Sequence, residues 1–125
     1  MALRLSYLCF DANDPHRLAA FWAEALRWEV DDSHDAVVRL RPTDGTAFAL
    51  DFLPVPSTEP KHEKNRIHLD VTPDGTDQRA EVERLLALGA TSVDIGQGEV
   101  DWVVLADPDG NELCVLSPVS SGSDP

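Results

Sequence analysis

The strongest constraint in this sequence is an internal repeat of secondary-structure signals. Both halves of the 125-residue chain predict a strand, a helix and then three short strands. When Tyr7 is placed on His68, Leu8 falls on Leu69. One such unit leaves a face of its small sheet uncovered by its single helix. The repeat therefore predicts an α+β fold of two β-α-β-β-β modules, with a cleft between their curved sheets.

The helix of the first half has clear start signals. Asp14 is a good N-cap residue, and Pro15 follows at the first helical position. Apolar side chains then recur at helical spacing from Leu18 to Leu26, which predicts a buried stripe. The strands of this half are expected at residues 3–11, 28–30, 36–40 and 47–53.

The second half repeats this order with different cap residues. Thr76 or Asp77 can cap its helix, and Gly89 sits where a residue that ends a helix belongs. The strands here are expected at residues 66–71, 91–95, 101–106 and 111–117.

The connector and the tail differ in composition from the two halves. Residues 54–65 are rich in proline and charge, and the last residues read SSGSDP. We therefore expect one domain over residues 1–118, with modules at about 3–53 and 66–117, a linker at 54–65 and a flexible tail at 119–125.

The charge and the cysteines limit the classes of partner. Ten basic against 23 acidic residues give a net charge of −13, which disfavours nucleic acid and anionic membranes. This acidity serves solubility or attracts cationic ligands. No apolar run suits a membrane span, and no secretory leader is recognisable. Cys9 and Cys114 are far apart in apolar strand patterns, which predicts buried free thiols in a cytoplasmic protein.

Strand alternation selects the side chains that should face the cleft. Every second residue points away from the helix, and buried polar groups need partners. The convergent polar side chains are expected to be Tyr7, Asp51, His68, Asp70 and Glu112. The further residues of the ligand cleft are expected to be Cys9, Arg66, Trp102 and Cys114, with Trp102 either a wall residue or a stacking surface.

Four stretches together resemble one known superfamily. They read DPHRLAAFWAEALRWEV, KNRIHLDV, AEVERLLALGA and WVVLADPDGNELCVL, in this order, over most of residues 3–117. The sequence is similar to the vicinal oxygen chelate superfamily of glyoxalases, bleomycin and fosfomycin resistance proteins and extradiol dioxygenases. It most resembles the small glyoxalase-like domain proteins.

This resemblance implies a set of metal ligands. Metal-using members bring a histidine from the first strand, a second from the matching strand, and a glutamate from the last strand. His68 and Glu112 match the second and third positions, and Tyr7 falls on the first. A fourth carboxylate, used by glyoxalase I, would fall on Ala49 or Asp51. The resemblance leaves open a divalent metal (Ni, Zn, Mn or Fe) on His68 and Glu112, or none.

Three functions follow from the residues and the resemblance. The first is a glyoxalase-like lyase or isomerase that binds a small oxygenated metabolite, with His68 and Glu112 as metal ligands or as an acid–base pair. The second is a metal-free drug or metabolite binder like the bleomycin resistance proteins. The third is an accessory domain that has lost its ligand. Glyoxalase I and dioxygenase activities are disfavoured because Tyr7 replaces a histidine; whether the chain forms a homodimer, as many relatives do, is left open.

Overall fold

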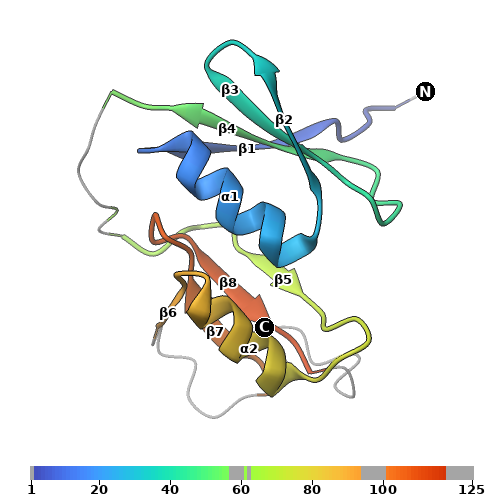
Figure 1. Cartoon of the computed structure of the whole chain (residues 1–125), viewed down its shortest axis with the longest axis vertical. Helices are drawn as coiled ribbons and strands as arrows, with labels where there is room; N and C mark the ends of the chain where they lie inside the picture. The colour runs from blue at the N-terminus through green and yellow to red at the C-terminus, as the bar shows by residue number, and fades with distance from the viewer. Residues whose placement is uncertain (1, 57–60, 62, 94–100, 118–125) are drawn as a thin grey trace. The chain divides into compact units, whose positions relative to one another are not determined.

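In a computed structural model, each half of the chain forms one α-helix and one four-stranded sheet (Figure 1). The chain divides into two compact units between Pro60 and Lys61. The predicted α+β class with two β-α-β-β-β modules is confirmed by this element order. The structure describes residues 2–56, 61, 63–93 and 101–117.

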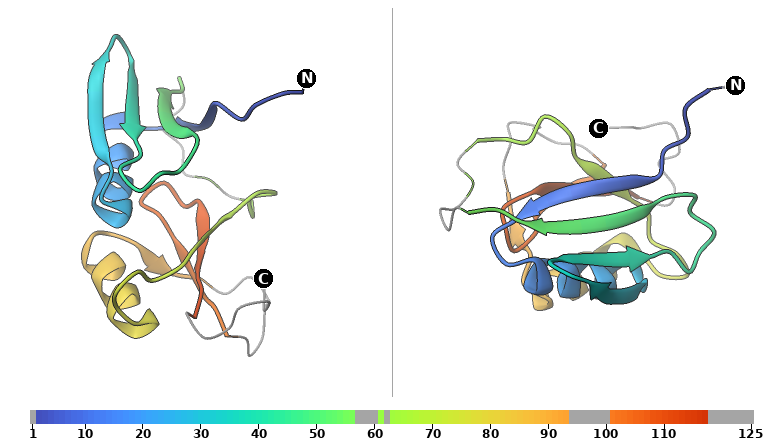
Figure 2. Two further views of the ribbon diagram at one scale, coloured as in Figure 1. Left: turned by 90° about the vertical axis from the view of Figure 1, so that its right-hand side faces the viewer. Right: turned by 90° about the horizontal axis from the view of Figure 1, so that it is seen from above.

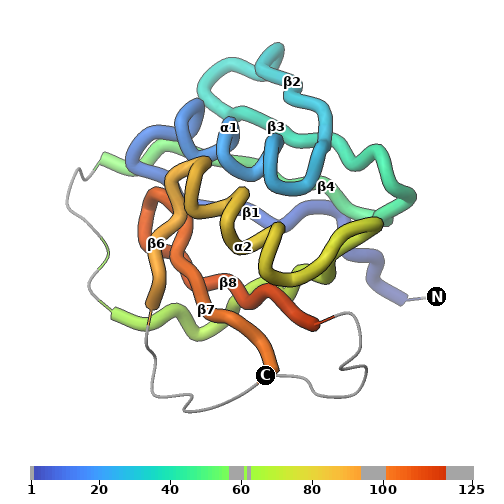
Figure 3. The backbone as a smooth tube through the Cα atoms, turned by 60° about the horizontal axis from the view of Figure 1, so that its bottom comes forward, coloured from blue at the N-terminus to red at the C-terminus, as the bar shows by residue number. Residues whose placement is uncertain are grey.

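The two sheets have the same topology. The strand order is β1-β4-β3-β2 in the first and β5-β8-β7-β6 in the second, with one parallel pair and two antiparallel pairs in each. Figure 3 traces this path through each unit. The elements of the first unit are β1 (Tyr7–Ala12), α1 (Pro15–Leu26), β2 (Glu29–His34), β3 (Val37–Arg41) and β4 (Ala49–Pro54). Those of the second are β5 (Leu69–Val71), α2 (Gln78–Ala87), β6 (Thr91–Ser92), β7 (Val103–Ala106) and β8 (Glu112–Val115).

Aromatic packing places α1 on one face of the first sheet. The ring of Phe10 on β1 lies 5.8 Å from that of Trp22 on α1 and 5.0 Å from that of Phe52 on β4. Trp22 and Phe52 are almost fully buried. Because side chains alternate along a strand, the neighbours of Phe10 and Phe52 project from the opposite face. The predicted division between a helix side and a polar side is confirmed for this sheet.

Both helices begin at the residues that the sequence predicts. The Asp14 carboxylate accepts a hydrogen bond from the Arg17 N–H at 3.2 Å, and that of Asp77 accepts one from the Ala80 N–H at 2.7 Å. Gly89 follows α2 with a φ of 118°, a left-handed conformation that favours glycine. Figure 2 shows α2 on one side of its own sheet. Neither helix in the described part of the chain is long and apolar enough to span a membrane.

Two strands, β1 and β5, begin three or more residues later than predicted. β1 starts at Tyr7 rather than residue 3, and Leu5 ahead of it is largely exposed. β5 starts at Leu69 rather than residue 66, so Ile67, expected to pack on the helix, is 72% exposed. Each strand extends only as far as its ladder with the parallel neighbour: Tyr7 pairs with Ala49, where β4 begins, and Leu69 pairs with Leu113, one residue after the start of β8.

The antiparallel strands also differ from prediction at their ends. β2 is longer than expected and runs to His34, because β3 pairs with it up to that residue. β6 contains only Thr91 and Ser92, and the rest of the strand predicted there lies partly outside the described residues. The predicted flexible tail and part of the predicted linker also lie outside them.

Candidate functional site

The polar face of the first sheet is organised around Arg39. Its Nε and Nη2 donate hydrogen bonds to the two carboxylate oxygens of Asp51 at 2.7 and 3.0 Å. The guanidinium carbon lies 4.1 Å from the ring centre of Tyr7, a cation–π contact. Asp51 is buried, whereas Tyr7 is 46% exposed. The carboxylate thus fixes a guanidinium over an accessible aromatic ring, and its hydrogen bonds raise the pKa of Arg39.

Two further residues of β1 and β4 complete this face. Ala49 pairs with Tyr7 and Asp51 pairs with Cys9 in the parallel ladder. The Cys9 thiol is exposed rather than buried as predicted, because it lies on the face that α1 does not cover. Partial desolvation, with the negative charges of Asp51 and Asp11, raises the pKa of Cys9.

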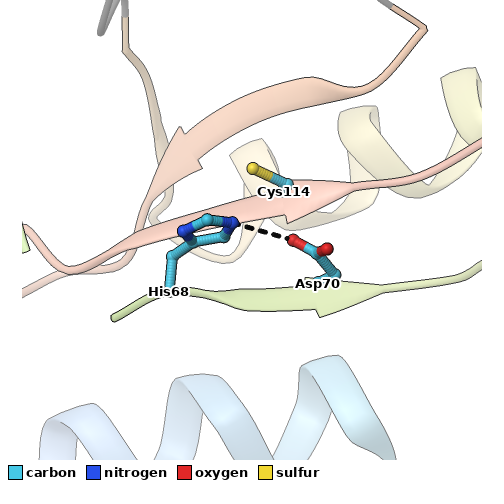
Figure 4. Close-up of side chains that lie close together, drawn as sticks. All are labelled: His68, Asp70 and Cys114. Atoms are coloured by element: carbon cyan, nitrogen blue, oxygen red, sulfur yellow. Dashed lines mark ion pairs between the residues drawn. The ribbon is translucent and has the colours of Figure 1, made fainter. Parts of the chain in front are cut away.

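Three potential metal ligands meet on the second sheet (Figure 4). His68 Nε2 lies 3.1 Å from Asp70 Oδ1, and both side chains are about 30% exposed. Cys114 on β8 pairs with Asp70 across the parallel ladder. The imidazole nitrogen, the carboxylate oxygen and the thiol sulfur all lie within 4.8 Å of one another. The sequence predicted these three residues on one face, and the structure brings them together.

The thiol in this cluster is deeply buried. Cys114 is only 1% exposed. Burial raises the pKa of Cys114 to about 11, assisted by the negative charge of Asp70 and a hydrogen bond to it. At neutral pH without a metal, Cys114 is therefore a protonated hydrogen-bond donor and a poor nucleophile.

Glu112 has partners other than His68. Its Oε1 accepts a hydrogen bond from the backbone N–H of Asn65 at 2.8 Å. Its Oε2 accepts no hydrogen bond of good angular geometry in the described chain, but Lys61 Nζ lies 2.9 Å away in an ion pair. Burial alone would raise the pKa of Glu112, but Lys61 and Asn65 outweigh it and lower that pKa. Glu112 is therefore an ionised carboxylate whose charge is balanced by the Lys61 ammonium.

A polar network anchors the segment that carries these partners. Asn65 Nδ2 donates to Asn111 Oδ1 at 3.0 Å, and Asn111 Nδ2 donates to the Asp107 carboxylate. The sequence did not predict Lys61, Asn65 or Arg39 as site residues. Asn65 was noted only as part of the stretch KNRIHLDV. The available signals were weak: Lys61 is a lysine in a segment without periodicity, and Arg39 is one charged residue within a strand.

Each polar face contains a cysteine paired with an aspartate, and the two residue types stand on opposite strands in the two sheets. In the first sheet Cys9 on the outer strand pairs with Asp51 on its neighbour. In the second sheet Asp70 on the outer strand pairs with Cys114 on its neighbour. The same register, extended by one residue, sets His68 beside Glu112 as Tyr7 is set beside Ala49. Ala49 rather than Asp51 therefore matches the fourth ligand position of the repeat.

The remaining predicted cleft residues differ in exposure. Arg66 lies ahead of β5 and is exposed, because the strand begins only at Leu69. Trp102 is half-buried just before β7. The prediction that His68 and Glu112 act together stays a prediction.

Sequence comparison assigns the chain to a family. The model of the glyoxalase-like domain matches residues 7–116. This protein belongs to the glyoxalase-like domain family. The resemblance drawn from the four sequence stretches is thereby confirmed. Among curated proteins, none matches this glyoxalase-like chain significantly.

Solved structures share the fold of this glyoxalase-like protein at low sequence identity. Fosfomycin resistance protein FosX from Mesorhizobium loti is 16% identical, with a TM-score of 0.68 over 98% of this chain and 97% of that one. A glyoxalase-related enzyme from Fulvimarina pelagi is 17% identical, with a TM-score of 0.67 over 94% and 91%. The antibiotic-binding protein TnmS3 from Streptomyces sp. CB03234 is 18% identical, with a TM-score of 0.64 over 94% and 98%. The chain therefore has the vicinal oxygen chelate fold.

The residues of this glyoxalase-like chain at the family's four metal-ligand positions do not suit a metal ion. Of the four positions, Tyr7 replaces the first histidine and Ala49 has no ligand atom. Glu112 is the last-strand carboxylate, but an ammonium group already neutralises it. A divalent ion at this carboxylate would have to displace Lys61. Of the two histidines in the family's ligand set, this chain keeps only His68.

Proposed function

We propose that this protein binds a small oxygenated molecule through the polar side chains of its sheets, without the metal-centred catalysis of the family's enzymes. One observation carries this proposal above the others. The last-strand carboxylate, Glu112, has Lys61 as its counterion and Asn65 as its hydrogen-bond donor. These partners satisfy the charge that a metal ion would otherwise neutralise.

The first sheet supplies recognition groups for such a ligand. Asp51 holds the guanidinium of Arg39 in a fixed orientation over Tyr7, and Tyr7 is partly exposed. A pre-positioned aromatic ring loses little conformational entropy on binding, which favours contact with flat or cationic ligands. The net charge of −13 also favours cationic ligands. The antibiotic-binding and fosfomycin-resistance structures of the same fold support small-molecule binding as the class of function.

Ligand binding in the presence of a chelator tests this proposal. The full chain in excess EDTA is screened by thermal shift against small oxygenated metabolites, fosfomycin and cationic aromatic antibiotics such as bleomycin, and hits are measured by calorimetry. We expect one-site binding, weakened by Tyr7→Ala and unchanged by Arg79→Ala, whose side chain is exposed on α2. If no compound of these classes raises the melting temperature, the proposal fails.

A second function rests on the His68–Asp70 pair. Their 3.1 Å contact is the arrangement in which a carboxylate orients an imidazole for proton transfer. This pair would move a proton at a carbon beside a carbonyl of a bound ligand, as in an isomerase or lyase. Deuterium exchange from solvent into that carbon, followed by NMR, tests this function. Exchange that is equal in His68→Gln and in the wild type would exclude His68 as the base.

The state of the thiols supports a reducing compartment. Cys9 and Cys114 are both free, and Cys9 is exposed to solvent. We therefore propose that the protein works in the cytoplasm.

A further inference from the structure

We infer that His68, Asp70 and Cys114 form a binding site for a divalent ion of the zinc type, which shares only His68 with the ligand set of the family's metal enzymes. Three donors of different chemistry, an imidazole nitrogen, a carboxylate oxygen and a thiol sulfur, lie within 4.8 Å of one another. Figure 4 shows the imidazole of His68, just before β5, and the carboxylate of Asp70 on β5 beside the Cys114 side chain on β8.

Strand register places these donors. Asp70 is two residues after His68, so both side chains project from the same face of the sheet. Cys114 pairs directly with Asp70 in the parallel ladder. An ion with bonds of about 2.0–2.3 Å to its ligands separates neighbouring donor atoms by about 3–4 Å. The His68–Asp70 distance of 3.1 Å is already of this size, and the thiol sulfur lies within 4.8 Å of both other donors, so it has to move closer on binding.

The chemistry of the donors selects the ion. A thiolate ligand favours Zn²⁺ and its spectroscopic substitute Co²⁺ over Mg²⁺ and Ca²⁺, which prefer oxygen alone. On binding, the Cys114 thiol releases its proton to solvent and His68 coordinates as a neutral imidazole. One thiolate and one carboxylate then balance the two positive charges of the ion. Three protein ligands leave a fourth position for water.

This site differs from the family's usual one in position and in consequence. It uses neither Glu112, which is paired with Lys61, nor the first-strand position occupied by Tyr7. β5 is an outer strand of only three residues, so few ladder hydrogen bonds hold it. A metal that joins His68 and Asp70 to Cys114 would tie this strand to β8. The inference does not depend on the proposed function, because the ion is measured without any organic ligand.

Cobalt absorption on the full-length chain tests the site directly. Metal-free protein, prepared with EDTA and then freed of it, is titrated with Co²⁺ and followed in the near-ultraviolet, where a thiolate–cobalt bond absorbs. Competition with Zn²⁺ then gives the zinc affinity. We expect one ion per chain, displaced by one equivalent of Zn²⁺. His68→Gln, Asp70→Asn and Cys114→Ser should each weaken binding at least about tenfold.

Matched controls separate this site from the alternatives. Cys9→Ser removes the other thiol of the chain and should leave the cobalt band intact. Circular dichroism confirms that each variant is folded. If Cys114→Ser does not fold, His68→Gln decides, because the His68 side chain is only partly buried. The inference is overturned if wild type gives no thiolate–cobalt band, if Cys9→Ser abolishes that band, or if folded His68→Gln binds as tightly as wild type.

Discussion

Lys61 Nζ lies 2.9 Å from Glu112 Oε2, and this ion pair occupies the carboxylate that metal-using relatives offer to their ion. Glu112 is 5% exposed and Lys61 is 25% exposed, so the pair is shielded from water on the Glu112 side. A shielded carboxylate depends strongly on its counterion, because unpaired charge is costly to bury. The first prediction follows from this dependence.

Removal of the Lys61 ammonium should destabilise the protein. In Lys61→Ala, Glu112 keeps the Asn65 N–H but loses its counterion, so we expect a loss of about 1–3 kcal/mol in the free energy of unfolding. Urea denaturation followed by circular dichroism measures this loss. Lys64→Ala is the control: its ammonium contacts an exposed backbone carbonyl, and we expect a change below about 0.5 kcal/mol. Equal effects of the two substitutions would contradict the assigned role of Lys61.

Loss of the two hydrogen bonds from Arg39 to Asp51 should lower the stability of the first unit. Arg39→Ala leaves the buried Asp51 without both of its hydrogen bonds, and we expect a loss of about 2–3 kcal/mol. Arg39→Lys should recover only part of this, because an ammonium cannot make the bidentate contact. Arg41→Ala, which removes an exposed side chain 3.7 Å from Asp31, is the matched control and should cost little. Full recovery by lysine would show that charge alone matters at residue 39.

The two cysteines should react at different rates. Cys114 is buried, whereas Cys9 is exposed with a raised pKa. Since only the thiolate reacts, we expect Ellman's reagent at pH 8 to label one thiol per chain, more slowly than a free thiol and faster as pH rises. Denaturation should release the second thiol. Cys9→Ser identifies the reactive residue, and rapid labelling of that folded variant would contradict the burial of Cys114.

Asp31 should stabilise the folded state above pH 3.8 and lose this effect in stronger acid. Hydrogen bonds from the Ser33 hydroxyl at 2.6 Å and from the Ser33 N–H at 3.1 Å lower the pKa of Asp31 from 3.8 to about 2. A carboxyl whose pKa falls on folding stabilises the folded state above its unfolded pKa. This contribution is lost as pH falls through the window from about 3.8 to 2. We expect an NMR midpoint near 2 for Asp31, moved upward in Ser33→Ala; a midpoint near 3.8 in both proteins would contradict this.

Much of this fold could be predicted because it depends on local signals. Asp14 and Pro15 define the start of α1, and strand alternation places Phe10 and Phe52 opposite Tyr7 and the other polar residues. These features depend on neighbours within a few positions along the chain. The start of β5 could not be predicted in this way, because it depends on hydrogen bonding to β8, a strand far away along the chain.

The partners within the site were harder to predict for the same physical reason. The position of Glu112 follows from strand alternation, but its pairing with Lys61 depends on how an aperiodic segment returns to the sheet. Arg39 finds Asp51 only because β3 lies next to β4, which a single charged residue in a strand does not reveal. The placement of His68, Asp70 and Cys114 on one face could be predicted from the sequence, since it follows from the repeat and from strand alternation.

Calorimetry of ligand binding in the presence and absence of EDTA tests the central claim most directly. The claim is that this glyoxalase-like protein recognises a small molecule through its own side chains, without a metal-centred reaction. We predict that a compound found in the thermal-shift screen binds with the same affinity, within about twofold, in excess EDTA and in excess Zn²⁺ or Ni²⁺. Binding that disappears with EDTA and returns only with added metal would contradict the claim.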